Sequence, residues 1–249
     1  MILAGFGRHG FRSENLGVDI KVVFKVSLID FPGKIASVVF LSQCNFRCPY
    51  CHNPELLQGF EKLPSIPEKE ILDFLQSKKG WLDGVVVTGG EPTLQASLPE
   101  FLRQLKKAGW LVKLDTNGSN PLMLKKLLAE KLLDFIAMDV KAPLAKYEKA
   151  TGVKVNLNAI QESVKLVQES GLAYEFRLTV VPKIFEEKDC QALGAWLQGS
   201  KKFVLQQFNP EHQVLDSAFQ NLKPFSPEEL KSFAEKLKPF FGLVELRGV

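Results

Sequence analysis

The stretch that decides the fold is IASVVFLSQCNFRCPYC, residues 35–51. It opens with an almost continuous apolar run, which is typical of a parallel strand covered on both faces, and it passes directly into a loop with three cysteines. Similar apolar runs occur at residues 84–88, 110–114, 134–138, 174–181 and 203–208, and helical patterns occur at residues 67–76, 98–108, 121–130, 157–170, 189–197 and 226–237. Strands that alternate with helices in this way predict an α/β fold with a parallel sheet of right-handed βαβ units.

The chain of 249 residues has the size and composition of one globular domain, with 45% hydrophobic and 24% charged residues. The net charge of +4 is small and the basic residues are spread out, so the sequence gives no sign of a nucleic-acid surface. There is no apolar run of the roughly 20 residues that a membrane span needs and no secretory signal pattern, so we expect a cytoplasmic protein. Residues 1–20 fit no element, and we interpret them as an N-terminal extension of a single domain over residues 21–249.

The cysteine loop places Cys44, Cys48 and Cys51 within eight residues, and the remaining cysteine is Cys190. This crowding, in a chain without an export signal, favours metal binding over disulfides. A structural zinc site needs four closed ligands, and His52 is poorly placed to be the fourth because it is adjacent to Cys51. Three thiolates can instead hold three corners of a [4Fe–4S] cluster and leave the fourth iron open to a substrate. Zinc, or three metal-free thiols, is the alternative interpretation.

Unusual residues also follow the other apolar runs: Gly89-Gly90-Glu91, Asp115-Thr116, Asp139 with Lys141, and Asn209. Taken singly, these residues are equally typical of turns or of a surface ion pair. In parallel α/β folds, however, the carboxyl ends of the strands and the loops beyond them form the active site. We therefore expect these residues to meet the cysteine loop at one edge of the sheet.

The cysteine loop resembles the signature of the radical S-adenosylmethionine superfamily. The segments LIDFPG, residues 28–33, and CPYCHNPE, residues 48–55, also resemble activating proteins of glycyl radical enzymes, most closely that of anaerobic ribonucleoside-triphosphate reductase. This resemblance covers about residues 21–215 and implies a partial (β/α)6 TIM-like barrel in a single domain. It implies that the amino and carboxylate groups of S-adenosylmethionine chelate the open iron, and that Tyr50 lies against the adenine.

The same resemblance implies roles for the residues at the strand ends. Gly89, Gly90 and Glu91 match an element that contacts the methionine ammonium group of S-adenosylmethionine. Asp115 and Thr116 match positions near the methionine carboxylate.

Charged residues farther along the chain also match functional positions of the family. Asp139, together with Asp115, matches positions that help to coordinate a monovalent cation, and Lys141 would bind the ribose hydroxyls or the carboxylate of S-adenosylmethionine. Asp30 and Arg177 match catalytic positions that order the pocket and contact the glycine loop of a partner enzyme. Arg177 lies inside an apolar run, so its charge requires a partner in any case.

The resemblance finally implies a reaction and its partners. A one-electron donor such as flavodoxin or ferredoxin reduces the cluster, S-adenosylmethionine is cleaved to a 5′-deoxyadenosyl radical, and this radical takes a hydrogen atom from a backbone glycine of a glycyl radical enzyme. Because only Cys190 lies outside the loop, we expect a single cluster. A further cofactor contact from Gln207, Asn209 or His212 stays open. The alternatives are a radical enzyme that acts on a small molecule in modified-base or cofactor biosynthesis, and a zinc-structured or electron-transfer protein.

Overall fold

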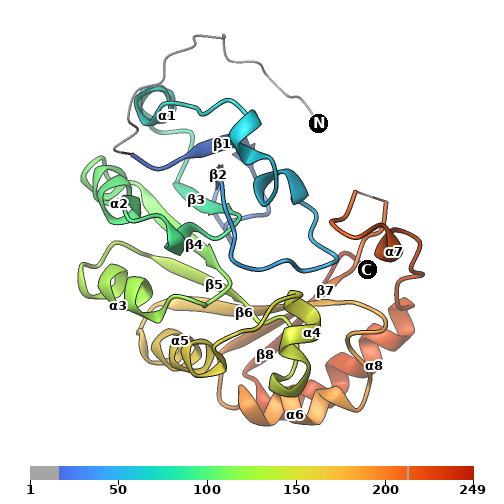
Figure 1. Ribbon diagram of the computed structural model, residues 1–249. Helices are drawn as coiled ribbons and strands as arrows, with labels where there is room; N and C mark the ends of the chain where they lie inside the picture. Colours follow the sequence, from blue (N-terminus) through green and yellow to red (C-terminus); the bar gives the residue numbers. More distant parts are fainter. Residues whose placement is uncertain (1–16, 212) are drawn as a thin grey trace.

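Eight strands form one sheet in the computed structural model, which describes residues 17–211 and 213–249 (Figure 1). The strands lie side by side in chain order: β1 (Ile20–Ser27), β2 (Ala36–Leu41), β3 (Gly84–Gly89), β4 (Leu111–Thr116), β5 (Phe135–Asp139), β6 (Ala173–Val180), β7 (Lys202–Gln207) and β8 (Leu243–Arg247). Strands β2 to β8 are parallel, and β1 pairs antiparallel with β2. Since β1 and β8 do not pair within the described residues, the sheet is an open, partial barrel.

The predicted α/β fold is confirmed. The six predicted strands appear as β2 to β7 with ends within two residues of the prediction, whereas β1 and β8 were not predicted. Most of the predicted N-terminal extension, residues 1–16, lies outside the described residues. Val18 and Ile20 are buried and Ile20 begins β1, so the sheet starts inside the stretch that we interpreted as an extension.

Helices cover one face of the sheet, along the left and lower sides of Figure 1. The predicted helices are present as α1 (Glu68–Ser77), α2 (Leu98–Lys107), α3 (Pro121–Ala129), α5 (Leu157–Glu169), α6 (Asp189–Trp196) and α8 (Pro227–Leu237). The short helices α4 (Tyr147–Thr151) and α7 (Ser217–Gln220) were not predicted, and single 3-10 turns occur at Pro54–Leu56, Phe60–Lys62, Pro92–Leu94, Leu144–Lys146 and Lys238–Phe240. No helix of the described residues is long and apolar enough to cross a bilayer.

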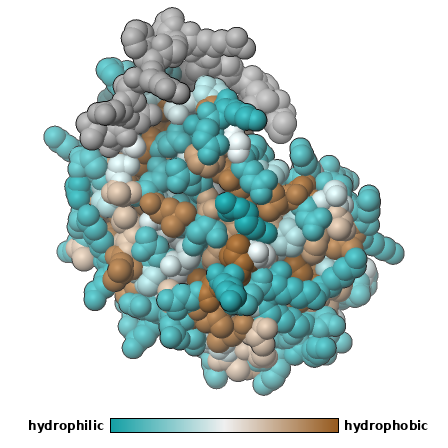
Figure 2. Space-filling model, in the orientation of Figure 1, coloured by the Kyte–Doolittle hydropathy of each residue, from teal (hydrophilic) through white to brown (hydrophobic). Residues whose placement is uncertain are grey.

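Side chains of successive strand residues alternate between the two faces of the sheet. On the helix side they form the main core, to which Val39 and Leu41 of β2 belong. On the other face, a smaller apolar cluster that includes Val38, Val86 and Phe135 lies beside charged residues of β4 to β6. The outer surface in Figure 2 is mostly polar, with apolar residues in small groups, so the apolar sides of the elements face inward.

Candidate active site at the cysteine loop

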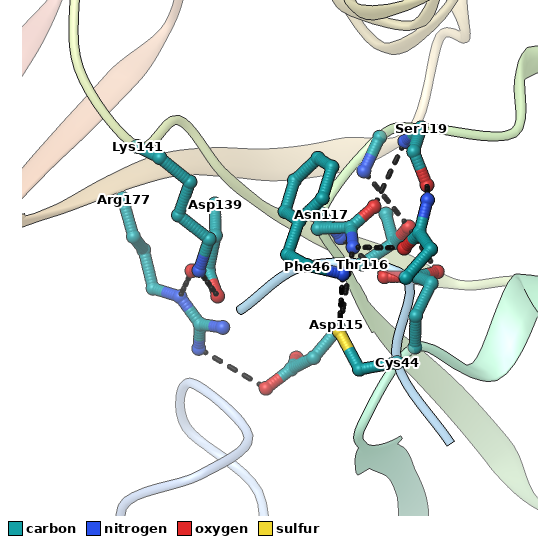
Figure 3. A network of polar contacts seen from close by, with 12 residues as sticks. Cys44, Phe46, Asp115, Thr116, Asn117, Ser119, Asp139, Lys141 and Arg177 are labelled. Carbon is teal, nitrogen blue, oxygen red and sulfur yellow. Dashed lines mark hydrogen bonds and ion pairs between the residues drawn. The ribbon is translucent and has the colours of Figure 1, made fainter. Parts of the chain in front are cut away.

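The cysteine loop begins directly after β2 and is held by backbone hydrogen bonds at both ends. Gln43 turns the chain with a φ of 70° and its N–H donates to Leu56 O at 2.8 Å, while Cys51 N–H donates to Cys48 O at 3.0 Å. The sulfur of Cys44 accepts from Phe46 N–H at 3.4 Å, as Figure 3 shows. The four cysteines of the chain are free thiols.

Burial dominates the chemistry of these thiols. It raises the pKa of Cys44 to about 11 and that of Cys48 to about 12, and it also raises the pKa of Cys51, although the nearby charge of Lys141 acts in the opposite direction on all three. Without metal the thiols are therefore protonated at neutral pH, and metal binding has to displace their protons.

The chemistry of the donor set fits an iron–sulfur cluster. Three free thiols lie on one short loop, and thiolates are soft ligands that can hold three corners of a cubane cluster. The N–H groups that point at Cys44 are also of the kind that tune cluster sulfurs.

The end of β3 is tied to the cysteine loop through its two glycines. Gly90 N–H donates to Leu41 O at 2.9 Å, and Glu91 N–H donates to Gln43 O at 2.7 Å. A Cβ on Gly89, whose φ is 125°, would lie 2.2 Å from Leu41 O, and a Cβ on Gly90 would lie 1.9 Å from Gln43 O. The glycines are thus required by the close approach of the protein's own loop, whereas the sequence had suggested close approach to a ligand.

Glu91 is completely buried and its carboxylate is used within the protein. One oxygen accepts from the Thr93 N–H at 3.1 Å and from the hydroxyls of Thr93 and Thr116, and the other accepts from Asn117 N–H at 2.6 Å. Burial raises the pKa of Glu91, and these hydrogen bonds oppose that rise. The geometry therefore makes Glu91 a link between the ends of β3 and β4, and its contact with an ammonium group stays a prediction.

The charge of Arg177, which the sequence predicted to need a counter-charge, is paired with two carboxylates (Figure 3). Its Nε donates to Asp139 Oδ1 at 2.8 Å and its Nη1 donates to Asp115 Oδ2 at 3.1 Å. Lys141 Nζ lies 3.2 Å from the other oxygen of Asp139, and the ammonium group of Lys113 pairs with Asp115. Asp139 of β5 and Arg177 of β6 are paired in the strand register, so their side chains lie together on the face of the sheet away from the helices.

The charges of this network hold one another ionised. Burial alone would raise the pKa of Asp139, but the charges of Arg177 and Lys141 outweigh it and keep that pKa below its usual value. Likewise, burial would lower the pKa of Lys141, and the charge of Asp139 outweighs it. Lys113 differs, because burial keeps its pKa below normal in spite of Asp115.

Asp30 lies apart from this network. It accepts a hydrogen bond from the Ser27 hydroxyl before β2 begins, so it lies toward the amino ends of the parallel strands. Tyr50 is buried in the cysteine loop near Lys141, and its hydroxyl has no hydrogen-bond partner among the described residues. Its placement against an adenine stays a prediction.

Three residues near the end of β7, Gln207, Asn209 and His212, were candidates for a further cofactor contact, and the structure describes two of them. His52 donates from Nε2 to Asn209 O at 2.8 Å, so Asn209 belongs to the surroundings of the cysteine loop. Gln207 donates to Phe225 O at 2.6 Å, away from the loop. His212 lies outside the described residues.

Sequence reasoning missed two residues of this site. Lys113 is a single lysine within an apolar run, and alternation along the strand was the one signal that it faces Asp115. Asn117 follows the Asp115-Thr116 pair, and its amide group donates to Asn45 at 3.0 Å and to Cys44 Sγ at 3.8 Å. An asparagine after a strand-end Asp-Thr pair carries no sequence signal for that contact.

The fold and the cysteine loop together define an α/β protein with three free thiols gathered at the carboxyl edge of its sheet. Residues 38–191 match the Radical SAM superfamily, and the chain belongs to this superfamily. Its members bind a [4Fe–4S] cluster and S-adenosylmethionine.

Two named proteins and one solved structure are similar to this chain. A protein of Methanocaldococcus jannaschii named as a glycyl-radical enzyme activating enzyme is 32% identical over 91% of this chain and 95% of its own length. The pyruvate formate-lyase-activating enzyme of Clostridium pasteurianum is 30% identical over 68% of this chain and 71% of its own length. The crystal structure of Streptococcus suis SuiB bound to the precursor peptide SuiA has a TM-score of 0.65 at 14% identity, over 85% of this chain and 48% of SuiB. That structural likeness shows the fold, and this chain spans about half the length of SuiB.

Proposed function

We propose that this protein is an activating enzyme that places a glycyl radical on a partner enzyme, and that the partner is anaerobic ribonucleoside-triphosphate reductase. The main support is the similarity to a protein named as a glycyl-radical enzyme activating enzyme, which extends over nearly the full length of both chains. The LIDFPG segment, residues 28–33, supports the same choice. A one-electron donor, such as flavodoxin or ferredoxin, completes the set of partners.

In this proposal Cys44, Cys48 and Cys51 hold a [4Fe–4S] cluster. When bound, the cluster would pass one electron from the external donor to S-adenosylmethionine, which would be cleaved to methionine and a 5′-deoxyadenosyl radical that takes a hydrogen atom from the partner's glycine. Protein residues bind, orient and exclude water around this chemistry. The backbone at Gly89 and Gly90 serves the methionine ammonium group, since it is fixed beside the cysteine loop.

The ionic network supplies the remaining contacts. Thr116 and Asp115 lie at the end of β4, where they are proposed to face the methionine carboxylate, and Lys141 supplies a positive charge beside Asp139. A monovalent cation at Asp115 and Asp139 would share their oxygens with Arg177. We therefore propose that the main role of Arg177 is to hold both carboxylates in place. Contact with the glycine loop of the partner is its second role.

The cluster assignment is tested by Cys48→Ala, with Cys190→Ala as the matched control. Cys48 lies in the loop, whereas Cys190 is a buried thiol of helix α6. We expect Cys48→Ala to stay folded but to lose iron, sulfide and production of 5′-deoxyadenosine under reducing conditions. Cys190→Ala should retain all three. Production of 5′-deoxyadenosine by Cys48→Ala would overturn the assignment.

The partner is tested by electron paramagnetic resonance. The reconstituted protein is reduced with S-adenosylmethionine in the presence of anaerobic ribonucleoside-triphosphate reductase, and a glycine-centred radical on the reductase is expected. If the reductase and other glycyl radical enzymes stay silent while a small molecule is turned over, the protein belongs to the small-molecule enzymes.

A further inference from the structure

Helix α4 and its cap, residues 147–152, contact the cysteine loop at Phe46 and Arg47, between its first two cysteines. Arg47 N–H donates to Thr151 O at 2.7 Å. Gly152, with a φ of 69°, packs so closely that a Cβ there would lie 2.4 Å from Arg47 O. Both contacts involve the backbone of Arg47, so they fix the path of the chain between Cys44 and Cys48.

The same residue also braces the loop from within. Arg47 Nη1 donates to Cys44 O at 2.6 Å and to Phe46 O at 2.8 Å. Its backbone is thus held by residues 147–152, and its side chain holds the carbonyls that precede it. This connection is therefore one of the contacts that position Cys44 relative to Cys48.

Residues 147–152 are themselves firmly fixed. Tyr147 is fully buried and packs edge-on between Phe46, at a ring distance of 6.5 Å, and Trp196 of α6, at 6.1 Å. Thr151 is also fully buried, and its hydroxyl donates to Tyr147 O at 3.0 Å. The loop therefore leans on an element that belongs to the core.

We propose that residues 147–152 are a positioning element for the cysteine loop, and that they set how firmly the loop retains its iron–sulfur cluster. The proposal rests on the cluster assignment in the proposed function. A loop whose backbone is ordered before metal binding loses less conformational freedom when its three thiolates are fixed. None of these residues has to touch the cluster for that effect.

The test compares Gly152→Ala with Gly171→Ala. Both glycines are exposed and follow a helix, and both have a positive φ, 69° and 73°, so alanine carries a similar backbone strain at either site. A Cβ at Gly171 meets nothing within 4 Å, in contrast to the contact of Gly152 with Arg47. The difference between the two variants isolates that contact.

The measurements are iron and sulfide per chain after anaerobic reconstitution, the rate of iron loss to an Fe(II) chelator, and the thermal midpoint of the metal-free proteins. We expect Gly152→Ala to lose iron at least about tenfold faster than Gly171→Ala, which corresponds to about 1.4 kcal/mol. Equal rates in the two variants would overturn the proposal. A native protein that takes up no iron would instead overturn the proposed function itself.

A second pair covers the case in which Gly152→Ala does not fold. Tyr147→Leu removes the ring of α4 that packs on Phe46 of the cysteine loop, and Tyr174→Leu removes a similarly buried ring of β6 that packs on Phe176. Faster iron loss from Tyr147→Leu than from Tyr174→Leu supports the positioning role of residues 147–152. Equal iron retention in these two variants excludes it.

Discussion

The carboxylate of Glu91 joins two strand ends without any exposure to solvent. Its four hydrogen-bond donors come from Thr93, Thr116 and Asn117. Glu91→Gln replaces one acceptor oxygen by an NH2 group that has to face a donor, and a buried donor left without a partner is costly. We expect the free energy of unfolding to fall by about 2–3 kcal/mol in urea denaturation.

Glu100→Gln on the exposed side of α2 is the control for that variant, because its surface ion pair with Arg103 should contribute nothing measurable. If Glu91→Gln were as stable as this control, Glu91 would not be a structural link. Its carboxylate would then be free for the ligand, as the sequence had suggested.

Arg177 can be tested in the same way. Its fork reaches Asp139 and Asp115 at once, which the single ammonium group of a lysine cannot do. Arg177→Lys should therefore lower the free energy of unfolding by about 1–2 kcal/mol, measured in urea. Arg103→Lys should leave stability unchanged, and an equal effect of both substitutions would argue against a bridging role for Arg177.

The sequence predicts which residues lie at the site better than it predicts which other residues they contact. Cys44 and Asp115 follow apolar runs, and that position alone places them at one edge of the sheet. The bridge from Arg177 to Asp115 and Asp139 depends on the register of three strands, which is fixed by packing over the whole sheet. The contacts of Glu91 were not predictable for the same reason, because two of its hydrogen-bond donors lie at the end of another strand.

The central strands were predictable because most of their residues form short apolar runs, and the edge strands were not. β1 (IKVVFKVS) is half exposed with two lysines, and β8 (LVELR) is short and alternating. Helix α4 has five residues, which is too short for a helical period to stand out. The missed elements are those whose structure depends on contacts with distant residues.

Strand β8 is held by charge as well as by backbone pairing. Arg247 donates both Nη groups to Glu175, at 2.8 and 2.7 Å, and Lys202 lies 3.2 Å from the same carboxylate, which is almost fully buried. Glu175→Gln removes the buried counter-charge of these two cations and leaves them only the half-exposed Glu245. We expect the free energy of unfolding at pH 7 to fall by about 2–3 kcal/mol.

The pH dependence of that loss identifies its origin. Burial would raise the pKa of Glu175, but Arg247 outweighs it and holds the pKa below the usual value. A carboxylate with a lowered pKa stabilises the fold above its unfolded pKa, and that contribution disappears as the pH falls toward the folded pKa. The stability gap between native and Glu175→Gln proteins should therefore shrink below about pH 4.3. The exposed Glu162→Gln should show no gap, and a gap that persists at low pH would point to packing instead.

In the molecule as a whole, the sheet and the cysteine loop are separate structural layers. The strands pair in unbroken chain order and pack against helices, while the loop rests on their carboxyl edge through a few contacts such as those of Gln43 and Arg47. This arrangement predicts that the metal-free protein keeps its fold. Order in the loop, in contrast, should depend on the metal.

Hydrogen–deuterium exchange before and after iron removal measures this separation directly. Chelation should speed exchange in residues 43–57, because this segment would lose the brace that three cluster-bound thiolates provide, while residues 147–152 should keep their protection, since Tyr147 and Thr151 are fixed in the core. Amides of β3 to β6 should keep their protection, since their hydrogen bonds lie within the sheet and are covered by helices. Equal loss of protection in β4 and in the loop would mean that the cluster holds the whole fold together, because local opening could not then occur without global unfolding.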